Sequence, residues 1–456
     1  MMGAVGGPGD PERARLAAEE LAGRGVSGVA LSWVDNAGIS RVKTVPVRRL
    51  ADAAVSGVGM SPVFDVFLVD DSITTSALIG GPVGDLRLYP DLDVLTPLAA
   101  QPGWAWAPAD RFTQEGRPHT ACQRHFAARM AEEAAARGIE FQMAFELEWF
   151  VGRAGEGDGT TPACTGPAYG LARLTELSSY SQHLLLALEE EGVPVDQFHP
   201  EYAAGQLELS TAAAAPLAAA DRVVLVKETI RAVSQAHGLR ASFAPVVVAG
   251  QVGNGGHLHC SAWSEGRNLF TGGDGPCGLT ARGESILAGL LDALPALCAV
   301  GAPSVAGYLR LVPQRWAGPW QCWGRENREA ALRLVTGTAG TEARAANAEI
   351  KCFDASANPY LVVGVVAAIA AAGADEGRRL PGEVTVDPAT LPAGDQPPRL
   401  PTSVTEAVAH LEKDGRFRAS MGDALFESFG AVRRAEVELF AASTDEEIAA
   451  ATRWRY

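Results

Sequence analysis

Apolar and polar side chains alternate along one segment, residues 140–150, in the way expected of a half-buried β-strand. Successive side chains of a strand point to opposite faces of the sheet. One face of this strand would carry the carboxylates Glu146 and Glu148. The other face would be apolar and would consist of Phe141, Met143, Phe145, Leu147 and Trp149.

Three further segments repeat this arrangement, with two polar residues separated by one apolar residue. The pairs are Gln206 with Glu208, His257 with His259, and Glu349 with Lys351. Any single pair is more typical of a solvated sheet face or of a row of salt bridges. Four such pairs, each with an apolar residue between its members, favour instead a polar site built on adjoining strands.

Carboxylates in an enclosed site need compensation, because each buried negative charge carries a large desolvation cost. A divalent cation would supply that compensation. Oxygen ligands with a single imidazole suit hard ions such as Mg²⁺ or Mn²⁺ rather than structural zinc. The sequence therefore predicts a site with two or more Mg²⁺ or Mn²⁺ ions.

The order of the predicted elements indicates two domains. A helix is expected at 11–25, followed by a hairpin whose first strand, 28–34, ends at the turn Asp35-Asn-Ala-Gly. Short β segments continue from there, so residues 11–113 are predicted to form a small, β-rich domain. Residues 114–456 are predicted to form a larger domain of antiparallel strands covered by helices, which makes the fold class α+β.

Helices in this second domain are expected at 122–138, 174–191, 218–238, 284–300 and 359–373. The last of these is the most apolar run, but it is shorter than the ~20 residues of a membrane span. It is therefore predicted to be a buried helix. The start of the chain lacks the order of charged and apolar residues found in a signal peptide.

The composition of the chain limits where in the cell the protein is expected and which partners it is expected to bind. The chain has 456 residues, of which 38 are basic and 54 acidic, and this excess of acidic residues argues against a nucleic-acid partner. Its seven cysteines are scattered and contain no Cys-x-x-Cys motif. They are typical of reduced thiols, so a cytoplasmic protein without a membrane partner is expected.

A group of arginines follows the histidine pair. Such a group is often only a solvated or ion-paired surface. Beside an acidic metal site, however, arginine forks suit phosphate or carboxylate groups and the charge that develops during phosphoryl transfer. A Walker-type glycine loop is absent, so a nucleotide would be held in another way. The arginines are Arg310, Arg325, Arg328 and Arg333.

Together these segments resemble glutamine synthetase of the bacterial type across nearly the whole chain. The resemblance rests on six ordered motifs. They are Phe145-Glu-Leu-Glu, the segment 201–208, Gly253-Asn-Gly-Gly-His-Leu-His, Tyr308-Leu-Arg-Leu-Val-Pro, Asn327-Arg-Glu-Ala-Ala-Leu-Arg and Asp354-Ala-Ser-Ala-Asn-Pro-Tyr-Leu.

The resemblance implies an N-terminal β-grasp domain, a catalytic domain, and a homo-oligomer, a double-ring dodecamer with active sites between subunits. It also implies a two-step reaction. ATP phosphorylates the γ-carboxylate of glutamate, and an amine then displaces phosphate from the γ-glutamyl phosphate.

The resemblance further implies roles for individual residues. Glu148, Glu201 and Glu208 would bind a first metal ion, and Glu146, His257 and Glu349 a second. Gly253 and Arg310 would receive glutamate. His259, Ser261, Arg328 and Arg333 would contact ATP, while Arg310, Arg328 and Lys351 would act in catalysis.

One departure bears on the acceptor. Where the glutamine-forming enzymes have a glutamate that takes a proton from ammonium, this chain has Trp316, six residues after Arg310. An indole cannot be that base. Trp316 is either a packing residue in a loop or, as we expect, one wall of a larger pocket for an organic amine, which cation–π attraction would favour.

Three smaller departures accompany it. The ammonium-binding aspartate of the family should be Asp71 or its neighbour Asp70, within a segment that has lost the family's spelling. Lys351 replaces the family's arginine, which predicts altered contacts with phosphate or carboxylate, because lysine lacks the guanidinium fork. No tyrosine lies between Tyr360 and Tyr456, so control by adenylylation is not expected.

The predicted function is thus an ATP-dependent ligase that joins glutamate to a small organic amine. Two alternatives stay open: an ammonium-dependent glutamine synthetase, and a catalytically silent relative that acts as a sensor or scaffold. The presence of all six metal ligands argues against the silent relative.

Overall fold

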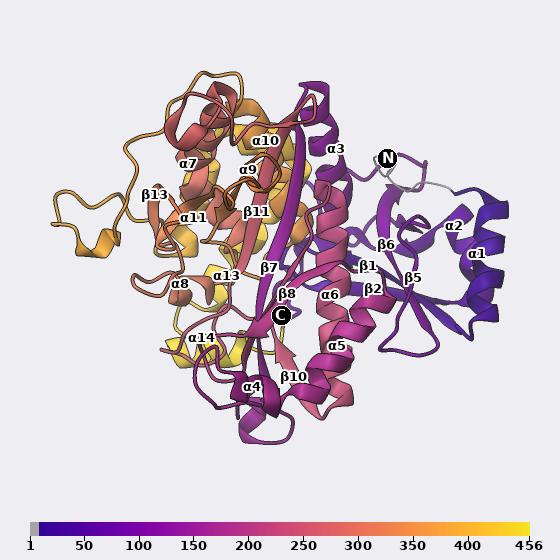
Figure 1. The fold of residues 1–456 in the computed structure, drawn as a ribbon. Helices are drawn as coiled ribbons and strands as arrows, with labels where there is room; N and C mark the ends of the chain where they lie inside the picture. Colours follow the sequence, from indigo (N-terminus) through magenta and orange to yellow (C-terminus); the bar gives the residue numbers. More distant parts are fainter. Residues whose placement is uncertain (1–8) are drawn as a thin grey trace.

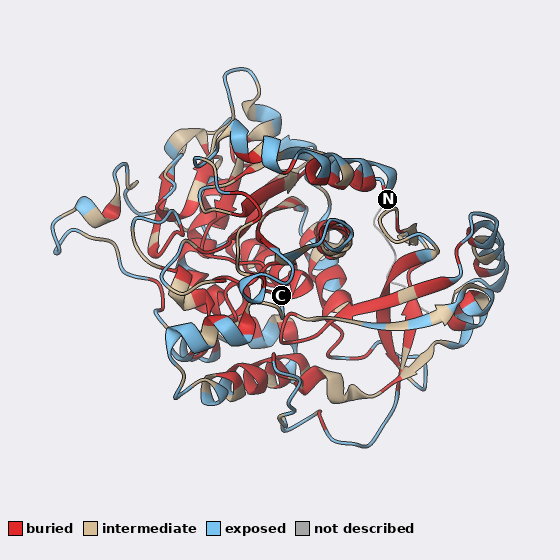
Figure 2. Ribbon diagram, turned by 90° about the horizontal axis from the view of Figure 1, so that it is seen from below, coloured by how far each residue is buried: buried red, intermediate tan, exposed pale blue. Residues whose placement is uncertain are grey.

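The computed structural model describes residues 9–456, which form two β-sheets flanked by helices (Figure 1). The α+β class predicted from the sequence is confirmed. Figure 2 shows buried residues concentrated on the strands and on the inner helix faces, while exposed residues follow the outer helices and loops.

The N-terminal sheet has six strands, and helices α1 (Pro11–Gly23) and α2 (Leu50–Ser56) lie at its outer end in Figure 1. The hairpin predicted at the turn Asp35-Asn-Ala-Gly forms as expected, with Gly38 in the left-handed region at φ 82°. The strands in spatial order are β2 (Ser40–Pro46), β1 (Gly28–Val34), β6 (Trp104–Thr113), β4 (Leu86–Pro90) and β3 (Val58–Met60), and β5 (Thr96–Pro97) pairs with β6.

The hairpin turn is one of the points at which this sheet contacts the second domain. A Cβ added at Gly38 would lie 1.9 Å from the carbonyl oxygen of Ser356, so only glycine fits there. The Nδ2 atom of Asn358 donates to the carbonyl oxygens of Val34 and Asp35 at 3.0 and 3.1 Å. The Asn-Pro-Tyr-Leu motif therefore fixes the hairpin as well as starting a helix.

The second sheet has nine strands. Its main path runs β13 (Trp320–Arg325), β14 (Ala330–Val335), β15 (Asn347–Ile350), β11 (Gly256–Ser264), β7 (Glu140–Arg153), β9 (Gln206–Thr211) and β8 (Val195–Pro200). Two short strands complete it, β10 (Leu239–Ser242) on β7 and β12 (Arg267–Asn268) on β11. Its pairs are antiparallel except β13 with β14, so the prediction of an antiparallel sheet was wrong at that edge.

The apolar face of β7 is buried as predicted, against helices α3 (Gln123–Ala136) and α6 (Pro216–Ala236). Helix α10 (Pro359–Gly373) packs between α3 and α7 (Ala281–Gly301), which confirms the buried helix predicted there. By length and composition α7 is apolar enough to cross a membrane, but 94% of that apolar window is buried inside the protein, as in a core helix.

The remaining helices cover the outside. The helix predicted at 174–191 is in fact two, because the chain bends at Leu177 between α4 (Leu171–Glu176) and α5 (Ser178–Glu190). Two short helices, α8 (Gly307–Arg310) and α9 (Glu342–Ala345), lie in loops. The C-terminal helices are α11 (Val404–Lys413), α12 (Gly415–Met421), α13 (Asp423–Leu439) and α14 (Asp445–Thr452).

The predicted domain boundary after residue 113 falls at the end of β6, and it stays a prediction, as does the β-grasp assignment. All seven cysteines lie in the described part of the chain, and none of them forms a disulfide.

Candidate active site

Strand register brings the predicted polar pairs side by side. Glu148 on β7 lies opposite Glu208 on β9, and Glu146 lies opposite His257 on β11. His259, two residues further along β11, lies opposite Glu349 on β15. Four adjoining strands thus place their polar residues on one face of the sheet.

The first cluster of this face consists of Glu146, His257 and Glu349. The Nδ1 atom of His257 lies 3.0 Å from an oxygen of Glu146 and 3.2 Å from an oxygen of Glu349. One ring nitrogen therefore faces two carboxylates at once. His257 and Glu349 are almost fully buried.

The second cluster consists of Glu148, Glu201, Glu208 and a histidine that the sequence analysis missed, His199. The Nε2 atom of His199 lies 3.1 Å from Glu208, and its Nδ1 atom lies 3.9 Å from Glu201. The clusters adjoin each other, since Nε2 of His257 is 3.8 Å from an oxygen of Glu148.

Neighbouring groups fix Glu148. One of its oxygens accepts hydrogen bonds from the amide of Gln206 at 3.0 Å and from the backbone N–H of Gly255 at 2.8 Å. A Cβ at Gly255 would lie 2.3 Å from Nε2 of His257, so the site requires glycine at that position.

The ionisation of these carboxylates reflects their crowding. Burial, assisted by the neighbouring Glu146, Glu148 and Glu201, raises the pKa of Glu208 to about 7. The hydrogen bond to Glu208 in turn raises the pKa of His199 to about 9. Burial also opposes ionisation of Glu146, but hydrogen bonds from His257 and His259 outweigh it and lower the pKa of Glu146.

The donor atoms of both clusters fit divalent cations. They offer carboxylate oxygens and imidazole nitrogens. His199, Glu201 and Glu208 place ligand atoms within 4.8 Å of one another, and so do Glu146 and Glu349 with His259, the histidine that follows His257 on the same face of β11. Like charges held this close are unfavourable unless a cation lies between them. The six predicted metal ligands are thus brought together, and their role as ligands stays a prediction.

Arg310 and Gly253 lie beside the first cluster. Arg310 is buried, and its Nη2 atom lies 2.9 Å from Nε2 of His257. Its Nη1 atom is buried without a hydrogen-bond partner in the described part of the chain. Because a buried unpaired donor is costly, this atom suits a substrate carboxylate. A Cβ at Gly253 would clash with the carbonyl of Pro245 at 2.1 Å.

Two basic residues hold Glu349 in place. The Nζ atom of Lys351 donates to it at 2.8 Å, and Nη1 of Arg333 donates to its other oxygen at 3.0 Å. In this structure Lys351 thus contacts a carboxylate of the protein. Its predicted contact with substrate, and that of Arg333 with ATP, stay predictions.

The histidine and serine predicted to bind ATP lie further along β11. Nδ1 of His259 lies 2.9 Å from the side-chain oxygen of Asn347, and its Nε2 atom lies 3.7 Å from an oxygen of Glu146. Ser261 is buried, and its hydroxyl accepts the indole N–H of Trp263 at 2.8 Å.

Trp316 lies in an exposed loop whose backbone donates hydrogen bonds to an acidic residue. Its side chain is 53% exposed, and its backbone is left-handed at φ 52°. The buried carboxylate of Glu329 accepts the backbone N–H of Trp316 at 2.8 Å and that of Gln314 at 3.2 Å. The guanidinium carbon of Arg328 lies 5.7 Å from the centre of the indole ring. Arg328, predicted to contact ATP, and Trp316, predicted to line the acceptor pocket, are therefore neighbours.

Asp71 is not brought to the clusters within its own chain. It forms ion pairs of 2.7 Å with Arg41 and with Arg455, in a left-handed turn at φ 71°. Asp70 accepts hydrogen bonds from the backbone and hydroxyl of Ser72. Neither contact decides which aspartate faces an amine.

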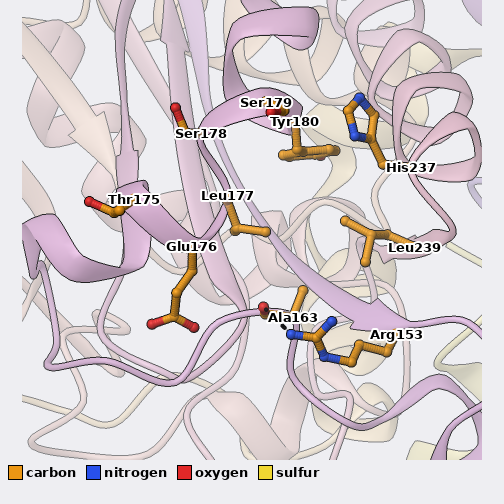
Figure 3. Close-up of a pocket in the computed structure, with 10 residues that line it drawn as sticks. All are labelled: Arg153, Ala163, Thr175, Glu176, Leu177, Ser178, Ser179, Tyr180, His237 and Leu239. Atoms are coloured by element: carbon orange, nitrogen blue, oxygen red, sulfur yellow. Dashed lines mark hydrogen bonds between the residues drawn. The ribbon is translucent and has the colours of Figure 1, made fainter.

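A surface pocket lies apart from these residues (Figure 3). It is lined by residues near the end of β7 and on α4 and α5, among them Arg153, Glu176 and Tyr180. None of the predicted site residues lines it.

Comparison with known proteins agrees with this geometry. Residues 120–450 match the family model of the glutamine synthetase catalytic domain. The chain belongs to the glutamine synthetase family. It is thus a ligase of a family that generally uses ATP and divalent metal ions, and the predicted ATP-dependent ligase activity is confirmed at that level.

Three similar proteins extend the match over nearly the whole chain. The gamma-glutamylpolyamine synthetase GlnA3 of Streptomyces coelicolor is 56% identical over 457 residues, which cover 99% of this chain and 98% of that protein. A gamma-glutamylanilide synthase of an Acinetobacter species is 27% identical over 476 residues, 95% of this chain and 93% of that protein. The crystal structure of a novel glutamine synthase homolog superposes with a TM-score of 0.84 at 31% identity and covers 94% of this chain and 99% of its own.

Glu146→Gln should weaken Mn²⁺ binding by at least about tenfold, because it removes a charged oxygen from the first cluster. Isothermal titration of the nucleotide-free protein measures this affinity. Glu140→Gln, the same change at the exposed start of β7, is the matched control and should bind as the wild type does. Wild-type affinity in Glu146→Gln would show that no cation binds there.

Metal affinity should also fall as the pH falls through about 7. A cation in the second cluster requires Glu208 to be ionised, and its pKa of about 7 leaves it mostly protonated at pH 6. We expect Mn²⁺ to bind about tenfold more weakly at pH 6 than at pH 8. Equal affinities at the two pH values would contradict a pKa of about 7 for Glu208.

Proposed function

We propose that this chain joins the γ-carboxylate of glutamate to an organic amine with more than one amino group, in preference to ammonium. The observation that supports this most directly is the exposed indole of Trp316, at the position where a base for ammonium would be expected. The high identity to a gamma-glutamylpolyamine synthetase supports the choice of a polyamine.

The electrostatics of the site suit such an acceptor. Glu201 and Glu208 face His199, and the ring of Tyr169 lies 6.1 Å from that histidine. Tyr169 and Trp316 are both about half exposed. Aromatic faces attract protonated amines through cation–π interactions.

In the first step the γ-carboxylate of glutamate attacks the terminal phosphoryl group of ATP, and the bond from that phosphorus to the β-phosphate oxygen breaks, so that γ-glutamyl phosphate and ADP form. Arg310, with its unpaired Nη1 atom, would hold a carboxylate of glutamate beside the first cluster. Bound Mg²⁺ or Mn²⁺ would neutralise the phosphate oxygens. His259, Ser261, Arg328 and Arg333 would line the nucleotide side, as predicted.

In the second step the amine attacks the acyl phosphate, so that a C–N bond forms as the C–O bond to phosphate breaks. The loop at Trp316 would cover the acceptor while Glu329 fixes its backbone. Lys351 would act through Glu349, whose position it sets.

The proposal extends to the cellular location and the oligomeric state of the enzyme. We infer a cytoplasmic homo-oligomer, since the seven thiols are unpaired and Asp71 lies away from the clusters of its own chain. A dodecamer with sites between subunits would let Asp71 face a neighbour's acceptor site.

A panel of acceptors tests the proposal. Phosphate release from ATP and glutamate is measured with putrescine, spermidine, ethanolamine, hydroxylamine and ammonium. We expect kcat/KM for the two polyamines to exceed that for ammonium by at least about tenfold, roughly 1.4 kcal/mol of transition-state binding. If kcat/KM were highest for ammonium, the proposal of an organic amine as the acceptor would be refuted. If it were highest for ethanolamine, the proposal of a polyamine would be refuted. No release with any acceptor would contradict the ligase itself.

Glu329→Gln should raise KM for the polyamine more than KM for ATP, because it weakens the two backbone hydrogen bonds that hold the Trp316 loop. Hydrogen bonds to a charged group contribute about 1.5–3 kcal/mol, so an increase of about tenfold is expected. Glu156→Gln, an exposed change in another loop, is the control. Equal increases in both KM values would show that Glu329 supports the fold in general and not the acceptor loop.

A further inference from the structure

Three side chains with metal-binding atoms meet outside the active site. They are Asp110 on β6, Cys122 directly before α3, and His125 in the first turn of that helix. One ligand atom from each lies within 4.8 Å of the other two. The cluster therefore joins the last strand of the N-terminal sheet to the first helix of the catalytic domain.

His125 is enclosed by the other two side chains of this cluster. Its side chain is 10% exposed, and its imidazole faces the thiol of Cys122 and the carboxylate of Asp110. Its Nε2 atom points toward Oδ1 of Asp110 at 3.5 Å. The ring stands edge-on to Phe112, with centroids 4.8 Å apart. The ring is therefore held between the other two ligand groups.

Cys122 supplies the soft ligand. Its sulfur is buried and accepts the backbone N–H of Arg111 at 3.5 Å. A thiolate is the form that binds metal.

The charges around the cluster favour a further cation. The guanidinium of Arg124 donates hydrogen bonds to three buried carboxylates at 2.6–2.9 Å. These carboxylates belong to Asp91, Asp110 and Asp221. Three aspartates thus face one arginine and one imidazole, so that acidic side chains outnumber basic ones in these contacts. Buried charge of this kind is stable only when it is compensated.

We propose that Asp110, Cys122 and His125 together bind one Zn²⁺ ion. A thiolate, an imidazole and a carboxylate are ligands of tetrahedral zinc, whereas the active-site clusters offer oxygen and nitrogen only. The ion would fix α3 to β6, and so fix the N-terminal sheet to the catalytic domain.

Cobalt substitution tests this site separately from the active site. The full-length protein is stripped with chelator, saturated with Mg²⁺ and titrated with Co²⁺. We expect a thiolate-to-cobalt charge-transfer absorption at one equivalent, because only a site with a sulfur ligand gives that band. The band should disappear in Cys122→Ser and persist in Cys277→Ser, which removes the one cysteine that is not fully buried.

A second variant covers the case in which Cys122→Ser does not fold. His125→Gln keeps the sulfur but removes the imidazole, and should weaken Zn²⁺ binding by at least about tenfold in competition with a chromophoric chelator. Absence of the band in the wild type would overturn the proposal. A band unchanged in Cys122→Ser, or Zn²⁺ affinity unchanged in His125→Gln, would overturn it as well.

Discussion

Repulsion between carboxylates is the constraint on which the active site depends. The register of β9, β7, β11 and β15 places Glu146, Glu148, Glu208 and Glu349 on one face of the sheet. Packing of the opposite, apolar face against α3 and α6 fixes that register, because a slip by one residue would turn the apolar side chains outward. The hydrophobic core thus holds together charges that would otherwise separate.

The protein compensates part of this charge itself. His257 faces two carboxylates, His199 pairs with Glu208, and Lys351 with Arg333 holds Glu349. The compensation is incomplete in the second cluster, where the pKa of Glu208 is raised to about 7. A site that is still too negative is ready for divalent cations, and through them for the phosphates of ATP. Specificity for the acceptor depends on a different element, the loop at Trp316, which rests on Glu329 and not on the sheet.

The periodicity of the sequence predicted the pairs on the strands, because alternation determines which face a side chain occupies. It missed His199, although this residue stands two positions before Glu201 and would share its face in an extended segment. The contact of His199 with Glu208 depends on the pairing of β8 with β9, which one sequence does not reveal. The parallel pairing of β13 with β14 and the break at Leu177 were missed for the same reason, since tertiary packing decides both.

Other groups were out of reach because their partners are distant in the sequence. In the sequence Glu329 is one charged residue among several. Only the folded loop shows that its carboxylate accepts the backbone N–H of Trp316. Residues 122–138 were predicted as a simple amphipathic helix. In the structure the first turn of α3 contains Arg124 and His125, which face Asp91 and Asp110 of the predicted N-terminal domain.

The central claim is that two divalent cations bind between these strands. Crystals grown with Mn²⁺ and a nonhydrolysable ATP analogue, measured at the manganese absorption edge, test it most directly. The account predicts two anomalous peaks in each subunit, one beside Glu148, Glu201 and Glu208 and the other beside Glu146, His257 and Glu349. Manganese peaks elsewhere, with these side chains paired only among themselves, would contradict it.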